Sequence, residues 1–382
     1  MTLPNFKKSA VILFLASTLW ACSGSGGGEA PAETIDVKDK NRKDMLTNLA
    51  DNVIIPSYAS FQTKFDLMIA KKAAFIAKPE SSELIALRQA WADAYVEWQK
   101  VELFEFGPGE KYSIRNYFNI YPANISGINA DVSDAAPNLE VPASYDRQGF
   151  PALDYMINGA GANDTAILAY YAAPAEGAKR LAHLDRLTTR MSSLISKVRT
   201  DWGSTARETF VSKTGLDISS SSSLMVNAYV LHYERYIRSG KFGIPSGAML
   251  NGVPAAEKVG SFYKKDLSLT LAKTAQQAFV DFFNGKNFIT GVEGPSLKSY
   301  LNALGAKDGA TGKTLSEILN TQFEAIKTKL NALKPSLYDE VKTNNQAMKD
   351  TYTEMQKAVR MLKVDMTSAM SITITYTDND GD

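Results

Sequence analysis

The chain has 382 residues, of which 45% are hydrophobic, and its 42 Lys and Arg nearly balance 41 Asp and Glu. This length suits two domains or one large one, and the apolar content suits a sizeable core. Because no basic tract and no interleaving of aromatic and basic residues is present, nucleic acid is excluded as a partner. Two histidines, His183 and His232, leave few residues for metal or acid–base chemistry.

The first residues have the pattern of a bacterial lipoprotein signal peptide. Lys7 and Lys8 precede an apolar run over residues 11–20, about half the roughly 20 residues that a spanning helix needs. Residues 19–22, Leu-Trp-Ala-Cys, then match a lipobox in which Cys22, the single cysteine of the chain, occupies the acylated position. We therefore expect residues 1–21 to be cleaved and Cys22 to carry lipid. The alternative is an ordinary secretory signal with a cysteine there by chance.

Residues 22–40 would then be the lipidated cysteine and a flexible tether, because Ser23 to Gly28 is rich in glycine and serine. With its cysteine used for lipid, the mature fold has no disulfide and is held by packing. The expected partner is a membrane, reached through Cys22. The expected location is the bacterial cell envelope, with the anchor in the outer membrane and the folded part on its periplasmic or surface face.

From residue 41 the apolar residues recur mainly at steps of three and four, which predicts an all-α protein. Helical bundles are the natural packing for such a chain, and we expect two bundle halves, over residues 41–210 and 211–370. Residues 371–377 alternate β-branched and aromatic side chains, and an acidic end follows. The last segment, 371–382, therefore predicts a short terminal strand or an extended tail.

Breaker and capping residues set the ends of the expected helices. We expect a helix over residues 41–77 that bends at Pro56, and a second helix that Ser81 or Ser82 caps and that ends at Gly107-Pro108. Residues 107–148 lack a strong period, which is typical of a functional segment or a surface excursion. The other predicted helices cover residues 149–159, 176–202, 219–239, 254–284, 296–304, 314–333 and 336–362.

The second of these helices carries an apolar stripe that includes Trp91 and Trp98, and Glu102 lies on its continuation. A carboxylate on a buried face needs a partner or a hydrogen-bond network. Glu102 is therefore a candidate ligand-binding residue and a candidate metal ligand. The alternative is that this face leaves the core near Gly107, so that Glu102 and Glu105 are solvated.

A short helix opens at Gly149 and Pro151 and places Asp154 on one face with Phe150 and Ile157. Aspartate is a poor residue for a helix interior, so Asp154 is expected to serve as a cap, a hydrogen-bond partner or part of a site. Gly149 and Asp154 are candidate ligand-binding residues, and Asp154 is also a candidate metal ligand. The alternative is a purely structural hydrogen bond.

The helix over residues 219–239 carries His232 on the flank of its apolar stripe, and a tight loop with Lys241 and Ser246 follows. His232, Lys241 and Ser246 complete the candidate ligand-binding residues, although a packed or surface histidine is the commoner role. His183 lies among charged residues of another helix and is expected to be solvated.

Four stretches, by their order and spacing, together resemble the imelysin family of bacterial envelope proteins. They are residues 98–108 (WQKVELFEFGP), the Gly149–Gly159 helix, the loop Lys241–Gly247, and the tail Tyr376–Asp382, which is similar to imelysin-like lipoproteins of the Bacteroidetes. The resemblance extends over most of residues 40–382. It implies an all-helical protein of two bundle-like halves and a link to bacterial iron uptake, and some members of the family have been described as peptidases.

The family signature, Gly-x-His-x-x-Glu, falls on Gly149, Pro151 and Asp154. The glycine is kept, proline replaces the histidine, and aspartate replaces the glutamate. The side chain of proline has no donor and no lone pair, so it can neither bind a metal nor move a proton. Asp154 can still accept hydrogen bonds or ligate a hard cation, but it is not a site by itself.

Three functions are consistent with these observations, and we expect no catalytic residues. The favoured one is a non-catalytic envelope lipoprotein that binds a ligand, such as a peptide, or an envelope iron-uptake protein, in a cleft lined by Glu102, Asp154 and the Lys241 loop. The second is a protein that holds iron, or another divalent or trivalent metal, with carboxylates and tyrosines. The third is a metallopeptidase, disfavoured because the signature histidine is Pro151. Ligands of one ion must converge, so the first two differ in whether Glu102 and Asp154 approach each other.

Overall fold

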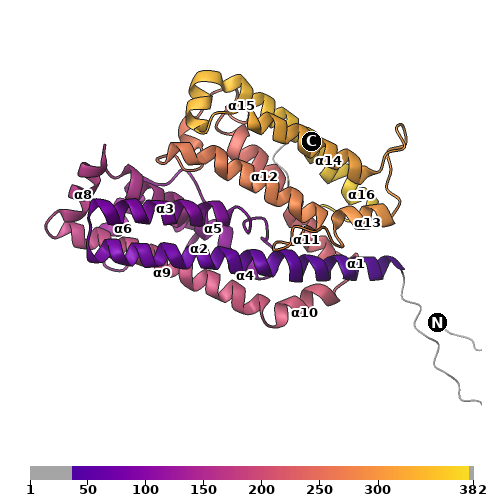
Figure 1. Ribbon diagram of the computed structural model, residues 1–382, viewed down its shortest axis with the longest axis horizontal. Coiled ribbons are helices and arrows are strands. Elements are labelled where there is room, and N and C mark those ends of the chain that lie inside the picture. Colours follow the sequence, from indigo (N-terminus) through magenta and orange to yellow (C-terminus); the bar gives the residue numbers. More distant parts are fainter. Residues whose placement is uncertain (1–36, 378–382) are drawn as a thin grey trace, which may run out of the picture. The chain divides into compact units, whose positions relative to one another are not determined.

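The computed structural model describes residues 37–377 (Figure 1). The regular secondary structure in this range is helical. Within that range the β contacts are two isolated antiparallel bridges, Lys286 with Glu293 and Lys307 with Thr314. The predicted all-α class is therefore confirmed. The signal peptide, Cys22, the tether up to residue 36 and the acidic end 378–382 lie outside the described residues.

The described part of the chain forms α-helices of very different lengths. In chain order they are α1 Val37–Asn48, α2 Ile55–Ala77, α3 Ser81–Trp98, α4 Pro108–Lys111, α5 Ile114–Phe118, α6 Ile125–Ser133, α7 Gly149–Asp154, α8 Asp164–Ala172, α9 Glu176–Trp202, α10 Thr205–Ser212, α11 Ser221–Leu231, α12 Ser268–Asn284, α13 Leu297–Ala303, α14 Leu315–Asn331, α15 Leu337–Arg360 and α16 Thr367–Ala369. π-Helical segments extend four of these helices, at Leu49–Ile54, Tyr155–Gly159, His232–Gly243 and Met361–Met366.

The first predicted helix is present as α1, a π-helical segment and α2, with Pro56 in the first turn of α2. Proline cannot donate to the carbonyl four residues earlier, which here belongs to Asn52. That carbonyl instead accepts a hydrogen bond of 2.8 Å from the backbone N–H of Phe288. The wider π turn and this long-range bond thus accommodate Pro56 and tie α2 to a loop near residue 288.

The second predicted helix is shorter than its apolar stripe suggested. Helix α3 ends at Trp98, and turns bonded to Trp98 and Val101 carbonyls follow, so the expectation of an end at Gly107-Pro108 was wrong. The expected cap was also wrong, because Glu80 is the N-cap residue and Ser81 is already helical. The turns direct Phe104 and Phe106 into the core, where both are buried. This change of direction is what brings residues 99–105 to the site.

An aromatic cluster holds α2, α3, α5 and α7 together. Tyr95 stacks on Phe150 with ring centroids 4.6 Å apart, and Trp98 stacks on Phe118 at 4.7 Å. Phe61 of α2 contacts Trp98, Phe118 and Phe150. Aromatic pairs in these geometries add to the stabilisation from burial, so the residues next to them in the chain are firmly positioned.

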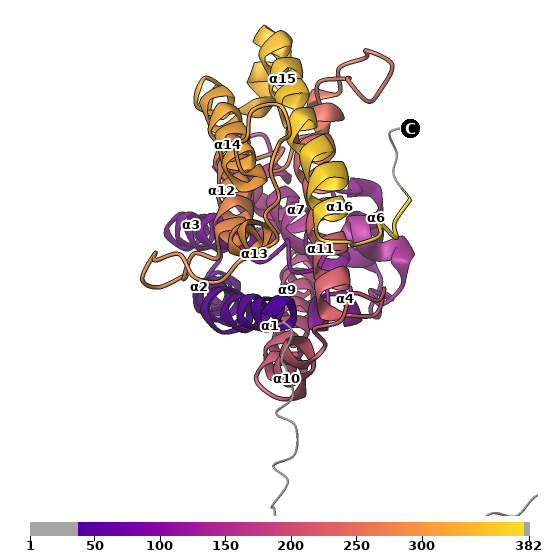
Figure 2. The same cartoon turned by 90° about the vertical axis from the view of Figure 1, so that its right-hand side faces the viewer.

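Helices α12, α14 and α15 pack together in the later part of the chain, and α15 also contacts the π-helical segment His232–Gly243 (Figures 1 and 2). The helix expected over residues 254–284 begins only at Ser268, and short 3₁₀ turns precede it. The expected division at residue 210 stays a prediction. No helix within residues 37–377 is both long enough and apolar enough to cross a membrane.

Residues 372–377, the last that the structure describes, form an extended segment rather than a strand. The side-chain amide of Asn227 donates to the Thr373 carbonyl at 3.0 Å and accepts from the Thr375 N–H at 2.8 Å. One side chain thus replaces the neighbouring strand that the alternating pattern of residues 371–377 had suggested.

Candidate functional site

Two neighbouring pockets lie where the turn after α3, the end of α5, α7 and the π-helical segment His232–Gly243 meet. They have Tyr121 and Pro122 in common. The first, which we call the Glu102 pocket, has a volume of about 250 Å³ and is lined by Glu102, Asn119, Ile120, Tyr121, Pro122, Arg235, Tyr236, Gly240, Lys241, Ile244 and Lys258. The second, the Asp154 pocket, has a volume of about 210 Å³ and lies beside Pro151, Asp154 and the loop Val259–Tyr263.

Glu102 is buried, with 2% of its surface exposed, and only one of its carboxylate oxygens is bonded. Oε1 accepts a hydrogen bond of 2.7 Å from the side-chain amide of Asn119. Asn119 in turn accepts one of 2.5 Å from the Tyr95 hydroxyl, which belongs to the aromatic cluster. Oε2 has no hydrogen-bond partner among the described residues. A buried carboxylate oxygen without a donor is costly, so this atom is the natural contact for a ligand or a bound water in the pocket.

Lys241 supplies the opposing charge. Its ammonium is buried and donates to Gln99 Oε1 at 2.8 Å. Burial lowers the pKa of Lys241, and the nearby charge of Glu102 acts against that lowering. The two side chains line one pocket, and no ion pair within 4.0 Å joins them in the described part of the chain. One pocket is therefore lined by two buried, oppositely charged side chains that do not form an ion pair with each other among the described residues.

The side chains that line the Glu102 pocket include more cations than carboxylates. Arg235, Lys241 and Lys258 line it, and Glu102 is the single carboxylate among its lining residues. Burial and the charge of Glu102 raise the pKa of the Tyr121 phenol, so its hydroxyl keeps its proton at neutral pH. The pocket can thus offer N–H and O–H donors to an anionic group.

His232 is buried behind this pocket and does not line it. Both ring nitrogens lack hydrogen-bond partners among the described residues. Burial, with the charges of Arg115 and Lys241, holds the pKa of His232 well below its usual value, so the ring is neutral. Its ring stacks on Tyr236, and the Arg115 guanidinium lies 3.9 Å from the centre of the Tyr236 ring. His232 and Arg115 therefore position Tyr236, which does line the pocket.

Asp154 is fully engaged by the fold. Its Oδ2 accepts from the Tyr263 N–H at 2.9 Å, and its Oδ1 accepts from the Lys264 N–H at 3.1 Å and from the Asn158 amide at 3.0 Å. Burial raises the pKa of Asp154 to about 7, although these hydrogen bonds favour its ionised form. Asp154 therefore fastens the loop around residue 263 to α7.

The residues at the signature position do not fit a metal ion. Pro151 offers no ligand atom, and both oxygens of Asp154 already accept N–H groups. Within residues 37–377, no three His, Cys, Asp or Glu side chains converge so that they could hold a metal. Glu102 and Asp154 line different pockets and have no hydrogen-bond partner in common.

The other sequence candidates have structural roles in this fold. Gly149 has φ +78°, and a Cβ there would lie 2.3 Å from the Phe118 carbonyl oxygen, so this glycine allows α7 to touch α5. Ser246 is buried, donates to the Gly243 carbonyl at 3.3 Å and lies in neither pocket. His183, expected to be solvated, is in fact buried with Nδ1 3.0 Å from the Arg186 guanidinium, so that expectation was wrong.

Several lining residues escaped sequence reasoning. Asn119 and Tyr121 come from a segment without helical periodicity, and Lys258 lies in the part of the predicted helix 254–284 that is not α-helical in the structure. The one available signal was the long aperiodic stretch 107–148, since such stretches are often functional. These residues meet in one pocket because the chain turns after α3. The apolar stripe of that helix had predicted that the helix continues, so the turn was not predicted.

Comparison with known proteins defines the class. The imelysin family model matches residues 54–366, which is most of the chain, so the protein belongs to the imelysin family. An imelysin-like protein from Psychrobacter arcticum has the same fold, with a TM-score of 0.67 and 18% identity over 89% of this chain and 99% of its own.

Two further relatives carry the name iron-regulated protein A. A solved structure from Parabacteroides distasonis, described as a candidate iron-regulated protein A precursor, has a TM-score of 0.68 and 16% identity, over 88% of this chain and 97% of its own. Iron-regulated protein A of Synechococcus elongatus is 24% identical over 112 residues, 29% of this chain and 30% of the relative. The match therefore spans about a third of that relative's length.

Proposed function

We propose that the protein is a lipid-anchored, non-catalytic binding protein of the bacterial cell envelope that serves iron acquisition, and that the Glu102 pocket binds a small anionic chelate of ferric iron. The observation that carries the proposal is the unpartnered Glu102 Oε2 in a pocket whose other charged groups are three cations. Donors from Arg235, Lys241 and Lys258 suit the carboxylates of a chelate. A hydroxyl group on the same chelate can donate to Oε2.

A chelate suits this pocket better than a bare ion or a peptide bond awaiting hydrolysis. A bare ferric ion needs several anionic oxygen ligands, whereas the pocket has one carboxylate and the Tyr121 phenol retains its proton. Hydrolysis by a metal needs about three protein ligands and an open position, which the Pro151–Asp154 region lacks. The iron connection comes from the names of the relatives and is a proposal for this chain.

Calorimetric titration of the purified protein with ferric citrate tests the binding site. We expect saturable binding at one site, and Lys241→Met should weaken it about tenfold or more because a buried charge-assisted contact is lost. Lys43→Met, at an exposed lysine of α1, is the matched control and should bind as the wild type does. Equal affinity of Lys241→Met and Lys43→Met would refute the assignment to the Glu102 pocket.

The anchor is tested separately by fractionation of cells that express the protein. The wild type should sediment with membranes and partition into detergent, and Cys22→Ser should move it to the soluble fraction because no thiol remains for acylation. If Cys22→Ser stays with the membranes, the lipid anchor is wrong while the pocket assignment is unaffected.

A further inference from the structure

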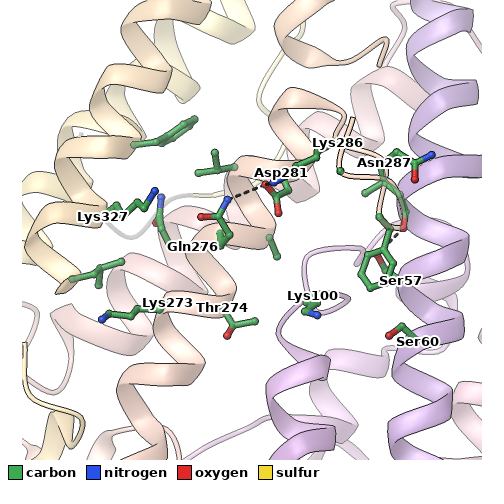
Figure 3. Close-up of a pocket in the computed structure, with 18 of the residues that line it drawn as sticks. Ser57, Ser60, Lys100, Lys273, Thr274, Gln276, Asp281, Lys286, Asn287 and Lys327 are labelled. Atoms are coloured by element: carbon green, nitrogen blue, oxygen red, sulfur yellow. Dashed lines mark hydrogen bonds and ion pairs between the residues drawn. The ribbon is translucent and has the colours of Figure 1, made fainter. Parts of the chain in front are cut away.

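A third pocket, larger than the two around Tyr121, lies elsewhere in the fold. It has a volume of about 710 Å³ and is bounded by α2, the turn after α3, α12, the loop near residue 288 and α14 (Figure 3). None of its lining residues lines the Glu102 or the Asp154 pocket. A pocket of this size can enclose an ordinary small organic molecule.

Four lysines from four segments line this space, which we call the lysine pocket: Lys100, Lys273, Lys286 and Lys327 (Figure 3). Its lining carboxylates are Asp281 and Glu324.

Three of the lysines have nearby acids. Lys100 lies 2.8 Å from Glu97, Lys286 lies 3.5 Å from Asp281, and Lys327 lies 3.4 Å from Glu324. Glu97 is only 8% exposed, whereas both partners of the Lys286 and Lys327 pairs are at least 32% exposed. The Lys286 and Lys327 pairs are therefore weak, and a ligand anion can compete for these two ammonium groups.

Lys273 differs from the other three lysines. It is partly buried in α12 and, within residues 37–377, has neither an ion pair nor a side-chain hydrogen bond. The charge of Lys273 is therefore the one that no acid within ion-pair distance compensates in the described part of the chain.

Gln276, one turn further along α12, gives independent evidence for a ligand. It is 3% exposed and lines the pocket, and neither its amide nitrogen nor its amide oxygen has a hydrogen-bond partner among the described residues. The Tyr233 hydroxyl lies beside Gln276, and this interaction partly opposes the burial that raises the pKa of Tyr233, but the two groups do not reach hydrogen-bond geometry. Buried amides are nearly always bonded, because an unpaired one costs the loss of its hydration. Phe104, Val280 and Phe323 add apolar wall to the same pocket.

We propose that the lysine pocket binds a small organic anion: an oxyanion head group at Lys273, a polar contact at Gln276, and an apolar body against Phe104 and Phe323. Carboxylate, sulfonate and phosphate head groups share the chemistry that Lys273 recognises. The apolar body distinguishes this ligand from a free inorganic ion.

Fluorescence titration of the full chain with 8-anilinonaphthalene-1-sulfonate, an aromatic sulfonate, tests this proposal. We expect saturable binding at one site that Lys273→Met weakens about tenfold, whereas Lys43→Met leaves it unchanged. The neutral dye N-phenyl-1-naphthylamine should bind much more weakly, since it lacks the head group. Equal binding of both dyes, or equal affinity of Lys273→Met and Lys43→Met, would overturn the proposal.

Gln276→Leu supplies a second readout. Replacing an unpartnered buried amide with an apolar side chain of similar size should leave the melting temperature unchanged or higher. The same variant should bind the sulfonate several-fold more weakly, because the polar contact is lost. A lower melting temperature with unchanged sulfonate binding would show that Gln276 serves the fold and not a ligand, and would overturn its place in the proposal.

Discussion

Gly149→Ala is expected to lower the free energy of unfolding by about 3 kcal/mol or more, or to prevent folding. Two costs combine at this position. A φ of +78° disfavours any residue with a Cβ, by about 1–2 kcal/mol. In addition, the new Cβ would lie 2.3 Å from the Phe118 carbonyl oxygen, which is backbone and cannot rotate away. Helices α5 and α7 must separate, and the rings of Phe118 and Phe150, which join the two helices, separate with them. Urea unfolding followed by circular dichroism measures the loss.

Gly252→Ala is the matched control for this prediction. Gly252 has φ +84°, but an added Cβ would meet no atom within 4 Å. Gly252→Ala should therefore lower the free energy of unfolding only by the cost of the positive φ, about 1 kcal/mol. Equal losses in the two variants would mean that the contact between α7 and Phe118 contributes nothing, contrary to the structure.

Lys241→Met is the second large effect, an expected loss of about 3 kcal/mol in the free energy of unfolding. The substitution leaves the buried Glu102 without its compensating charge, and an uncompensated buried charge typically costs about 3–5 kcal/mol. It also leaves Gln99 Oε1 without its donor. Because the two charges do not touch, we expect the lower end of this range.

The double variant Lys241→Met/Glu102→Gln isolates the coupling of the two charges. With the carboxylate neutralised, it should recover at least half of the loss, since the amide oxygen introduced at position 102 can still accept the hydrogen bond from the Asn119 amide. A double variant as unstable as the sum of the two single variants would show that Glu102 and Lys241 act independently.

The sequence predicted much of the helical framework, because apolar period and capping residues act locally. Glu176–Trp202 was predicted with the ends that α9 has, and the predictions for α14 and α15 differ from the structure by a few residues. The errors lie where tertiary contacts overrule the period. The stripe of Trp91 and Trp98 continues in the sequence past residue 98, but packing of Phe104 and Phe106 turns the chain there.

The candidate site could be predicted only in part. Glu102 was selected because it lies on the continuation of an apolar helical face, but the helix ends at Trp98, before it reaches Glu102. The expected burial of Glu102 is nevertheless present in the structure. Lys241 lines the same pocket as Glu102, whereas Asp154, His232 and Ser246 have roles in the fold. No local pattern reveals that Asn119 and Tyr121 would meet Lys258, because these contacts join segments more than a hundred residues apart.

Diffraction from crystals of the protein soaked in ferric citrate, recorded at the iron absorption edge, tests the central claim most directly. The account predicts one anomalous iron peak inside the Glu102 pocket, between the side chains of Glu102 and Lys241. It also predicts that crystals of Lys241→Met lose this peak. An iron peak bound to Asp154, or no peak in the Glu102 pocket at a saturating concentration, would contradict the proposed function.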